Sequence, residues 1–329
     1  MPYEHVSVIG AGAWGTALAL VAARAGRHVI LWSREAEVAA GIEETRENTR
    51  FLPGIALPPT IRATSDLPTT LAAGAVLLSV PAQHVRAIVH EIGPRIVPDS
   101  ALVVCAKGIE RGSGKLLTEV LGECMPAAEP AMLSGPSFAG EVARELPTAV
   151  TIAAKKHVVF RLLATLGHGT FRPYASEDMV GVALGGAAKN VYAIGCGIVA
   201  GLGLGENARA ALLTRSFAEL CRLGVALGAR HETLMGLSGL GDLVLTATSL
   251  TSRNFALGFK LGEGCAREQL LAPRHPLAEG VETAAALVAR GRRHAIELPV
   301  AEAIADILAG TLTLDAAIPR LMARPFKAE

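Results

Sequence analysis

The chain has 329 residues, of which 51% are hydrophobic and 19% are charged. This composition excludes a disordered chain, and a length above about 250 to 300 residues favours two domains over a single core. Thirty-one basic residues nearly balance 30 acidic ones, for a net charge of +1, so no general attraction to nucleic acid or to an anionic membrane is expected.

The five cysteines are scattered along the chain, with no CxxC pair and no histidine at metal-ligand spacing. This pattern predicts neither a disulfide framework nor a bound metal. At the amino terminus, Glu4 is acidic where an export signal would be basic. We therefore expect a cytoplasmic protein.

The amino-terminal segment predicts a strand, a glycine-rich loop, a helix and a second strand, over residues 6–9, 10–15, 16–25 and 28–32. The loop has the sequence Gly10-Ala11-Gly12-Ala13-Trp14-Gly15. This is the GxGxxG spacing of a dinucleotide-binding fingerprint, in the βαβ context that the fingerprint requires. Gly10 would permit a tight turn, Gly12 the approach of backbone amides to a pyrophosphate, and Gly15 close packing of helix on strand.

The residues after the second strand bear on the choice of cofactor. NAD-specific sites usually place Asp or Glu there to bind the ribose 2′-hydroxyl, whereas this chain has Ser33 and Arg34. Arg34 can face a 2′-phosphate, so the sequence favours NADP or dual use of NADP and NAD. The alternative is a solvated arginine at the end of a strand.

Three further strands are predicted, and each ends in a polar or proline-marked turn, over residues 75–80, 101–105 and 131–134. The carboxyl ends of strands in a doubly wound sheet line the ligand crevice. Lys107 and Ser137 lie in two of these turns and are therefore candidate site residues. From position alone, each could equally be a surface loop residue.

After about residue 180 the pattern changes to long apolar helical segments separated by glycines, over residues 181–199, 206–227, 282–290 and 300–308. The predicted fold class is therefore α/β, with a Rossmann-type doubly wound sheet followed by an all-helical C-terminal domain. We expect the dinucleotide-binding domain to span residues 1–185 and the helical substrate and catalytic domain residues 186–329.

One segment of the helical part, residues 179–205, is apolar enough to suggest a membrane span, with Lys189 as its only charge. Its eight glycines and its central lysine favour a buried helix of a soluble protein instead. Apolar surroundings would lower the pKa of Lys189 toward neutrality, which suits a proton carrier. The alternative is a lysine that extends along its alkyl stem to the surface.

Two clusters follow in the helical part. Asp242 lies in an apolar, glycine-marked segment, where a carboxylate needs a partner, and Lys189 is a candidate for that partner. Ser252, Arg253 and Asn254 precede an apolar stretch, as expected of a helix start that binds a phosphate. An ordinary helix cap is the alternative.

Taken together, these motifs resemble the bacterial NAD(P)-dependent sn-glycerol-3-phosphate dehydrogenases nearly from end to end. The resemblance rests on six ordered blocks: Gly10 to Ala17, Lys107 to Glu110, Leu133 to Ala139, Gly185 to Asn190, Gly239 to Leu243, and Ser252 to Asn254. It implies that the protein interconverts glycerol 3-phosphate and dihydroxyacetone phosphate, so that its substrate is a small phosphorylated molecule. It also implies that the protein supplies glycerol 3-phosphate for glycerophospholipid synthesis and forms a homodimer.

The resemblance also implies roles for individual residues. Lys189 would transfer the proton, Lys107 would contact both cofactor and substrate, and Asp242 would lie beside them. The remaining substrate contacts would be Gly135, Ser137, Ser252, Arg253 and Asn254, and the remaining dinucleotide contacts Ala13, Trp14, Arg34, Ala139, Arg253 and Glu279. Two other functions remain possible at this point: a two-domain NAD(P)-dependent 2-hydroxy acid or hydroxyacyl dehydrogenase, and a non-catalytic dinucleotide-binding sensor.

Overall fold

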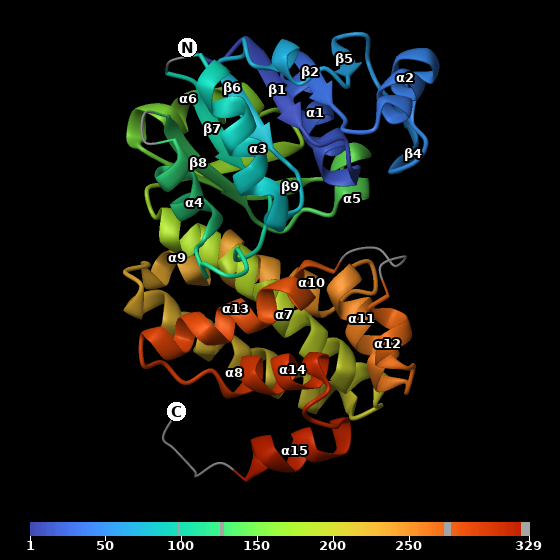
Figure 1. Cartoon of the computed structure of the whole chain (residues 1–329), viewed down its shortest axis with the longest axis vertical. Helices are drawn as coiled ribbons and strands as arrows, with labels where there is room; N and C mark the ends of the chain where they lie inside the picture. The colour runs from blue at the N-terminus through green and yellow to red at the C-terminus, as the bar shows by residue number, and fades with distance from the viewer. Residues whose placement is uncertain (98, 126–127, 273–277, 324–329) are drawn as a thin grey trace.

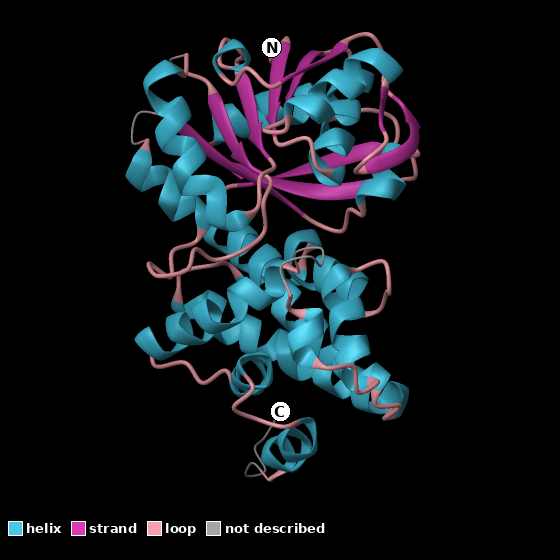
Figure 2. Cartoon of the chain, turned by 45° about the vertical axis from the view of Figure 1, so that its right-hand side comes forward, coloured by secondary structure: helices cyan, strands magenta, loops and turns pink. Residues whose placement is uncertain are grey.

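The computed structural model describes residues 1–97, 99–125, 128–272 and 278–323. A sheet flanked by helices forms one part of the molecule and a bundle of helices forms the other, with the carboxyl-terminal helix farthest from the sheet (Figure 1). All strands of the described residues lie in the first part (Figure 2). The predicted fold class, a doubly wound sheet followed by a helical domain, is confirmed.

The main sheet has eight strands in the order β10-β9-β8-β7-β6-β1-β2-β5. Neighbouring strands are parallel except β8 and β9, which are antiparallel. From β1 the chain winds outward to β2 and β5 on one side and to β6, β7 and β8 on the other, so the topological switch point lies between β1 and β6. The strands are β1 (His5–Ile9), β2 (His28–Trp32), β5 (Ile61–Thr64), β6 (Ala75–Leu78), β7 (Ala101–Val104), β8 (Glu129–Ser134), β9 (Thr148–Ala154) and β10 (Phe171–Ser176), with a separate hairpin of β3 (Glu47–Asn48) and β4 (Leu52–Ala56).

Both faces of the sheet are apolar, because successive side chains of a buried strand point to opposite faces. Val8 belongs to the hydrophobic cluster on one face and its neighbour Ile9 to the cluster on the other. The first cluster includes residues of α1 (Ala13–Arg24), α2 (Ala36–Thr45), α5 (Ala139–Ala143) and α6 (Lys156–Leu166). The second includes residues of α3 (Val85–Ile92), α4 (Leu117–Cys124) and α7 (Met179–Gly201), so it continues from the sheet into the helical part.

Helix α7 is the centre of the helical part. It packs against α8, α10, α11, α13 and α14, and it also contacts β8 and β9. Although α7 is long and apolar enough to cross a membrane, 94% of its most apolar window is buried inside the protein, as expected of a core helix. The surrounding helices are α8 (Gly205–Ala226), α9 (His231–Met235), α10 (Asp242–Ala247), α11 (Arg253–Gly262), α12 (Arg267–Leu270), α13 (Glu279–Arg293), α14 (Pro299–Ala309) and α15 (Leu314–Met322).

Two glycines allow α7 and α11 to cross with their backbones in contact. A Cβ added at Gly197 would overlap the carbonyl oxygen of Phe255, and one added at Gly258 would overlap that of Ile194. This close crossing holds α11 firmly against the helix that carries Lys189.

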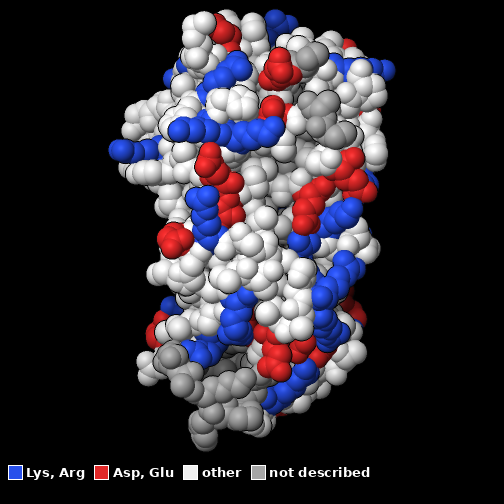
Figure 3. Space-filling model, turned by 90° about the vertical axis from the view of Figure 1, so that its left-hand side faces the viewer, with Lys and Arg blue, Asp and Glu red and all other residues white. Residues whose placement is uncertain are grey.

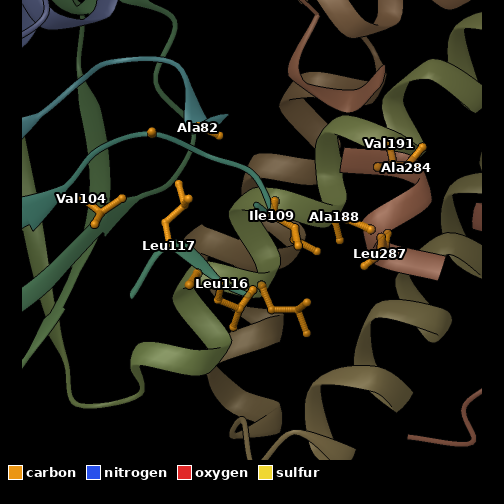
Figure 4. Packing of buried hydrophobic residues seen from close by; sticks show 14 of the residues in the cluster. Ala82, Val104, Ile109, Leu116, Leu117, Ala188, Val191, Ala284 and Leu287 are labelled. Carbon is orange, nitrogen blue, oxygen red and sulfur yellow. The ribbon is translucent and has the colours of Figure 1, made fainter. Parts of the chain in front are cut away.

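The loop after β7 joins the two parts of the molecule. Its apolar residues Ile109 and Leu116 belong to the same buried cluster as Ala188 of α7 and Leu287 of α13, and Figure 4 shows them at this junction. The position of the loop, and of Lys107 at its start, is therefore set by packing on the helical part.

The predicted elements match the structure closely, with β2 spanning the same residues as its prediction. Three strands of the main sheet were not predicted: β9 and β10 at one edge and β5 at the other. Helix α7 crosses residue 185, where we expect the domains to divide, so that division stays a prediction. On the face shown in Figure 3, basic and acidic side chains alternate in neighbouring clusters, in keeping with the balanced net charge.

Candidate active site

Three charged side chains from distant parts of the sequence meet between the sheet and α7. Lys107 follows β7, Lys189 lies in the middle of α7, and Asp242 is the first residue of α10. Gly185 permits this assembly, because a Cβ there would lie 2.5 Å from the carbonyl oxygen of Ser238, in the turn that leads into α10. The small residues that precede Lys189 thus let the Asp242 segment pack directly on α7.

Asp242 bridges the two lysines. Its Oδ1 accepts a hydrogen bond from Lys189 Nζ at 2.5 Å, and its Oδ2 accepts one from Lys107 Nζ at 2.7 Å. Lys189 Nζ also donates to Thr246 Oγ1 at 2.8 Å. The predicted pairing of Lys189 with Asp242 is confirmed, and the surface alternative for Lys189 is wrong, because the residue is 7% exposed and Asp242 is fully buried.

This cluster has two positive groups and one negative group, so its formal charge is positive. Burial is the main cause that lowers the pKa of Lys189; the Asp242 carboxylate raises it and the nearby Lys107 lowers it, and together these effects give a pKa of about 7. A group with a pKa of about 7 can donate or accept a proton at neutral pH.

The turn after β8 lies beside Lys107. The Gly135 carbonyl oxygen accepts hydrogen bonds from Lys107 Nζ and from Ser137 Oγ, both at 2.9 Å. Gly135 has φ of +141°, and a Cβ there would lie 2.9 Å from Val150 Cα, so this turn requires glycine. Gly135 and Ser137, predicted as substrate contacts, therefore lie in one group with Lys107.

A chain of amide hydrogen bonds links the lysines to the start of α11. Asn190 Nδ2 donates to the Lys107 carbonyl oxygen at 3.2 Å, and Asn254 Nδ2 donates to Asn190 Oδ1 at 2.9 Å. The backbone amide of Gly280 then donates to Asn254 Oδ1 at 2.9 Å. Asn254 thus joins α7, α11 and the start of α13.

The residues beside Asn254 differ in exposure. Ser252 Oγ accepts a hydrogen bond from the Phe255 amide at 3.3 Å, which confirms the helix cap that the sequence suggested. Its hydroxyl hydrogen remains able to donate to a ligand. Arg253, in the first turn of α11, is exposed and lies close enough to Glu279 to favour the charged form of that carboxylate.

The glycine loop has the geometry that a dinucleotide requires. Gly10 has φ of +113°, and a Cβ there would lie 2.9 Å from the Ser79 carbonyl oxygen; a Cβ at Gly15 would overlap the Gly10 carbonyl oxygen. A Cβ at Gly12 would meet nothing within 4 Å, and no side chain caps the first amides of α1. The amino end of α1, with Ala13 and Trp14 in its first turn, thus fits a pyrophosphate at the switch point of the sheet.

The residues after β2 include Arg34, which the sequence predicts to face a 2′-phosphate. Arg34 has 73% of its side chain exposed and forms an ion pair with Glu35 at 3.0 Å. Glu35 also accepts a hydrogen bond from Ser33 Oγ at 3.5 Å. The chain thus carries an acid, Glu35, one residue after Arg34, and the contact of Arg34 with a 2′-phosphate stays a prediction.

Glu279 and Ala139 complete the predicted dinucleotide contacts. Glu279 Oε1 accepts a hydrogen bond from the Ala82 amide at 3.3 Å, after β6, whereas its buried Oε2 has no partner among the described residues. Burial raises the pKa of Glu279 to about 7, although the Ala82 amide and Arg253 oppose this effect. Ala139 begins α5, which packs against α1, the helix that follows the glycine loop.

Two residues that touch the cluster, Thr246 and Asn190, were not predicted, and helical spacing indicates only the first of them. Thr246 lies one turn after Asp242, and Asn190 is the residue after Lys189. Within the described ranges, no group of three or more His, Cys, Asp or Glu side chains could hold a metal ion.

Comparison with known proteins gives a consistent result along the whole chain. Residues 5–159 match the family model for the N-terminus of NAD-dependent glycerol-3-phosphate dehydrogenase, and residues 178–319 match the model for its C-terminus. A glycerol-3-phosphate dehydrogenase [NAD(P)+] from Parvibaculum lavamentivorans is 54% identical, covering 100% of this chain and 99% of the relative. One from Bradyrhizobium sp. strain BTAi1 is 57% identical, covering 99% of each.

A solved structure agrees with these relatives. The crystal structure of glycerol-3-phosphate dehydrogenase from Coxiella burnetii superposes with a TM-score of 0.93 at 39% identity, covering 98% of this chain and 99% of that one.

Proposed function

The chain belongs to the NAD-dependent glycerol-3-phosphate dehydrogenase family, and we propose how its residues interconvert glycerol 3-phosphate and dihydroxyacetone phosphate with NAD(P)(H). The observation that carries the proposal is the buried Asp242 carboxylate between the ammonium groups of Lys189 and Lys107. Two cations around one anion leave a positive centre, which suits a phosphorylated substrate whose C2 oxygen becomes negative during reduction.

Lys189 carries the proton. In the direction of ketone reduction its ammonium donates to the C2 oxygen of dihydroxyacetone phosphate, and in the reverse direction its neutral amine accepts the proton from the C2 hydroxyl. A pKa of about 7 serves both directions at neutral pH, and such catalysis typically contributes about 10² to 10⁴ in rate. Bound NAD(P)H supplies the hydride for reduction, and bound NAD(P)+ accepts it in the reverse direction.

Lys107 and Asp242 set up the reacting centre. Lys107 places a second positive charge beside the C2 oxygen and stabilises the negative charge that develops there. Asp242 orients both ammonium groups and favours the protonated form of Lys189. Gly135 and Ser137, next to Lys107, would contact the substrate on the sheet side.

The start of α11 binds the phosphate. Arg253 provides an exposed cation, Ser252 a hydroxyl, and Asn254 the second hydrogen of its amide. The amide chain through Asn190 fixes this group relative to Lys107, so phosphate binding positions C2 for the reaction.

The dinucleotide is held by the sheet side of the crevice. The open amides at the start of α1, from Gly12 through Gly15, would bind the pyrophosphate. Arg34 would face a 2′-phosphate. The rest of the dinucleotide would be lined by Ala139, Lys107, Arg253 and Glu279. We retain the division at residue 185 as a proposal, with the glycine loop before it and the phosphate residues after it.

The test of this assignment is the turnover of Lys189→Ala with dihydroxyacetone phosphate and NADPH. We expect a loss of at least about 100-fold. The matched control is Lys260→Ala, which removes an exposed lysine of α11 and should leave turnover unchanged. Near wild-type turnover of Lys189→Ala would refute the proton role.

Three further properties are part of the proposal. We place the enzyme in the cytoplasm, because its cysteines are all free. We also propose that it supplies glycerol 3-phosphate for phospholipid synthesis. We also propose a homodimer, supported by exposed apolar side chains of the helical part such as Leu204 and Leu250. Light scattering of the purified protein measures the mass; a monomeric mass would refute the homodimer.

A further inference from the structure

A cavity of about 360 Å³ lies at the far end of the junction between the two parts of the molecule. The loop after β7 provides one wall and the last turn of α13 the other. The cavity is lined by Ser113, Gly114, Lys115, Glu119, Arg290, Arg293 and His294. Its volume is within the range of small-molecule sites, about 300 to 1,000 Å³.

The cavity is distinct from the active site. Helix α13 begins at Glu279, beside the crevice, and ends at Arg293, beside the cavity. At 1.5 Å per residue, these two ends are about 20 Å apart.

Positive charge exceeds negative charge around this cavity. Arg290 donates to both carboxylate oxygens of Glu119, at 2.8 and 2.7 Å, and Lys115 pairs with Glu123 at 2.6 Å. Arg293 donates to the Ser113 carbonyl oxygen at 2.9 Å and has no ion pair among the described residues. Among the residues that line the cavity, the three cations Lys115, Arg290 and Arg293 therefore accompany one carboxylate, that of Glu119.

A second observation concerns Arg290, one of the cations that line the cavity. Arg290 is 9% exposed, and its Nε is a buried donor without a partner within the described residues. A buried donor that lacks an acceptor is destabilising, and so is the mutual repulsion of cations that share a cavity. Basic residues are common in the last turn of a helix, which accounts for Arg290, Arg292 and Arg293, but Lys115 comes from another element, the loop after β7.

We propose that this cavity binds a phosphate-type anion, either free phosphate or the phosphate group of a small phosphomonoester. The anion would accept hydrogen bonds from Arg293 and Lys115, with Arg290 as a third positive group. Because the cavity joins the loop that begins at Lys107 to the helix that begins at Glu279, bound anion would hold the two parts of the enzyme together.

Thermal unfolding in the presence of inorganic phosphate tests the proposal. The whole chain is used with Arg253→Ala in every sample, so that the proposed substrate phosphate contact is removed. Sodium phosphate is raised to 20 mM while sodium chloride keeps the ionic strength constant. Ligand binding to the folded state raises the unfolding temperature, here by an expected few degrees.

Two charge reversals discriminate between the site and a general effect of charge. Arg293→Glu should abolish most of the rise, whereas Arg292→Glu, which reverses an adjacent exposed arginine paired with Glu302, should retain it. Equal rises in the two variants, or no rise in the Arg253→Ala background, would overturn the proposal. If Arg293→Glu shows no cooperative unfolding, Arg293→Gln and Lys115→Gln are used in its place. Each of them should also abolish most of the rise in unfolding temperature.

A parallel titration with glycerol 2-phosphate separates the two sources of the anion. A larger Arg293-dependent rise than with inorganic phosphate assigns the site to phosphomonoesters, and an equal or smaller rise assigns it to free phosphate. With either probe, a rise that does not depend on Arg293 counts against the site.

Discussion

Lys189 and Asp242 are 53 residues apart in the chain, yet their ammonium and carboxylate groups lie 2.5 Å apart in the buried contact of α7 with α10. Burial disfavours the charged form of Lys189, and Asp242 favours it. The result is a pKa of about 7, which neither an exposed lysine nor an unpaired buried lysine would have at this position. This pair is therefore the basis of the proposed proton transfer.

Removing the negative partner should move the pKa of the proton carrier. In Asp242→Asn, Lys189 remains buried beside Lys107 without a carboxylate, so its pKa should fall by at least about one unit. The measurement is the pH profile of kcat/KM for dihydroxyacetone phosphate, whose midpoint should move to lower pH. Thermal unfolding of the same variant shows whether the fold survives. If the variant is folded and the midpoint of its pH profile is unchanged, the result would count against the pairing.

The proposed phosphate role of Arg253 predicts a loss that depends on the substrate. Arg253→Ala should lower kcat/KM for dihydroxyacetone phosphate by about 10- to 100-fold, because a charge-assisted hydrogen bond is lost. With unphosphorylated dihydroxyacetone the variant and the wild type should be nearly equal. Steady-state kinetics on both substrates measures this difference, and equal losses on both would contradict the assignment.

Arg34 predicts a change of cofactor preference. Arg34→Asp replaces the cation that would face a 2′-phosphate with an acid that repels it and can bind the ribose 2′-hydroxyl. The ratio of kcat/KM for NADPH to that for NADH should fall, with activity on NADH retained. An unchanged ratio would show that the exposed Arg34 side chain does not select between the two cofactors.

A second buried carboxylate predicts how stability depends on pH. Glu219 accepts hydrogen bonds from the amides of Val300 and Ala301 and from Tyr192 Oη, and burial nevertheless raises its pKa to about 7. Between about pH 4.5 and pH 7 the unfolded chain loses this proton while the folded chain keeps it. The unfolded state then binds fewer protons, so the free energy of unfolding should fall as pH rises through this window.

Urea unfolding of Glu219→Gln at pH 5 and pH 7 measures that contribution. The variant has no carboxyl group to titrate, so its stability should fall less between the two pH values than that of the wild type. Glu279, whose pKa is also raised to about 7, remains in both proteins, so part of the decrease should persist. Equal decreases in wild type and variant would contradict the role of Glu219.

Much of the fold was predictable because the signals are local. Alternating strands and helices, the glycine loop and the Ser252 cap each depend on a few adjacent residues, and the structure contains all of them. The Lys189 and Asp242 pair was predictable because a charge in an apolar segment requires a partner. In contrast, β9 and β10 depend on long-range pairing that no local pattern shows.

The remainder of the site depends on three-dimensional packing. Asn254 bonds to Asn190 and Gly280 because close packing brings α7, α11 and α13 together. The second ion pair of Asp242, to Lys107, forms because the loop after β7 packs on the helical part. Neither contact has a signature in the sequence near those residues.

The most direct test of the central claim is the pH dependence of NADPH oxidation with dihydroxyacetone phosphate. If the ammonium of Lys189 donates the proton, kcat/KM should fall about tenfold per pH unit above a midpoint near 7, and the reverse oxidation of glycerol 3-phosphate should rise through the same midpoint. The substrate phosphate titrates near pH 6 and is measured separately as a control. A rate of ketone reduction that stays constant from pH 7 to pH 9 would contradict the account.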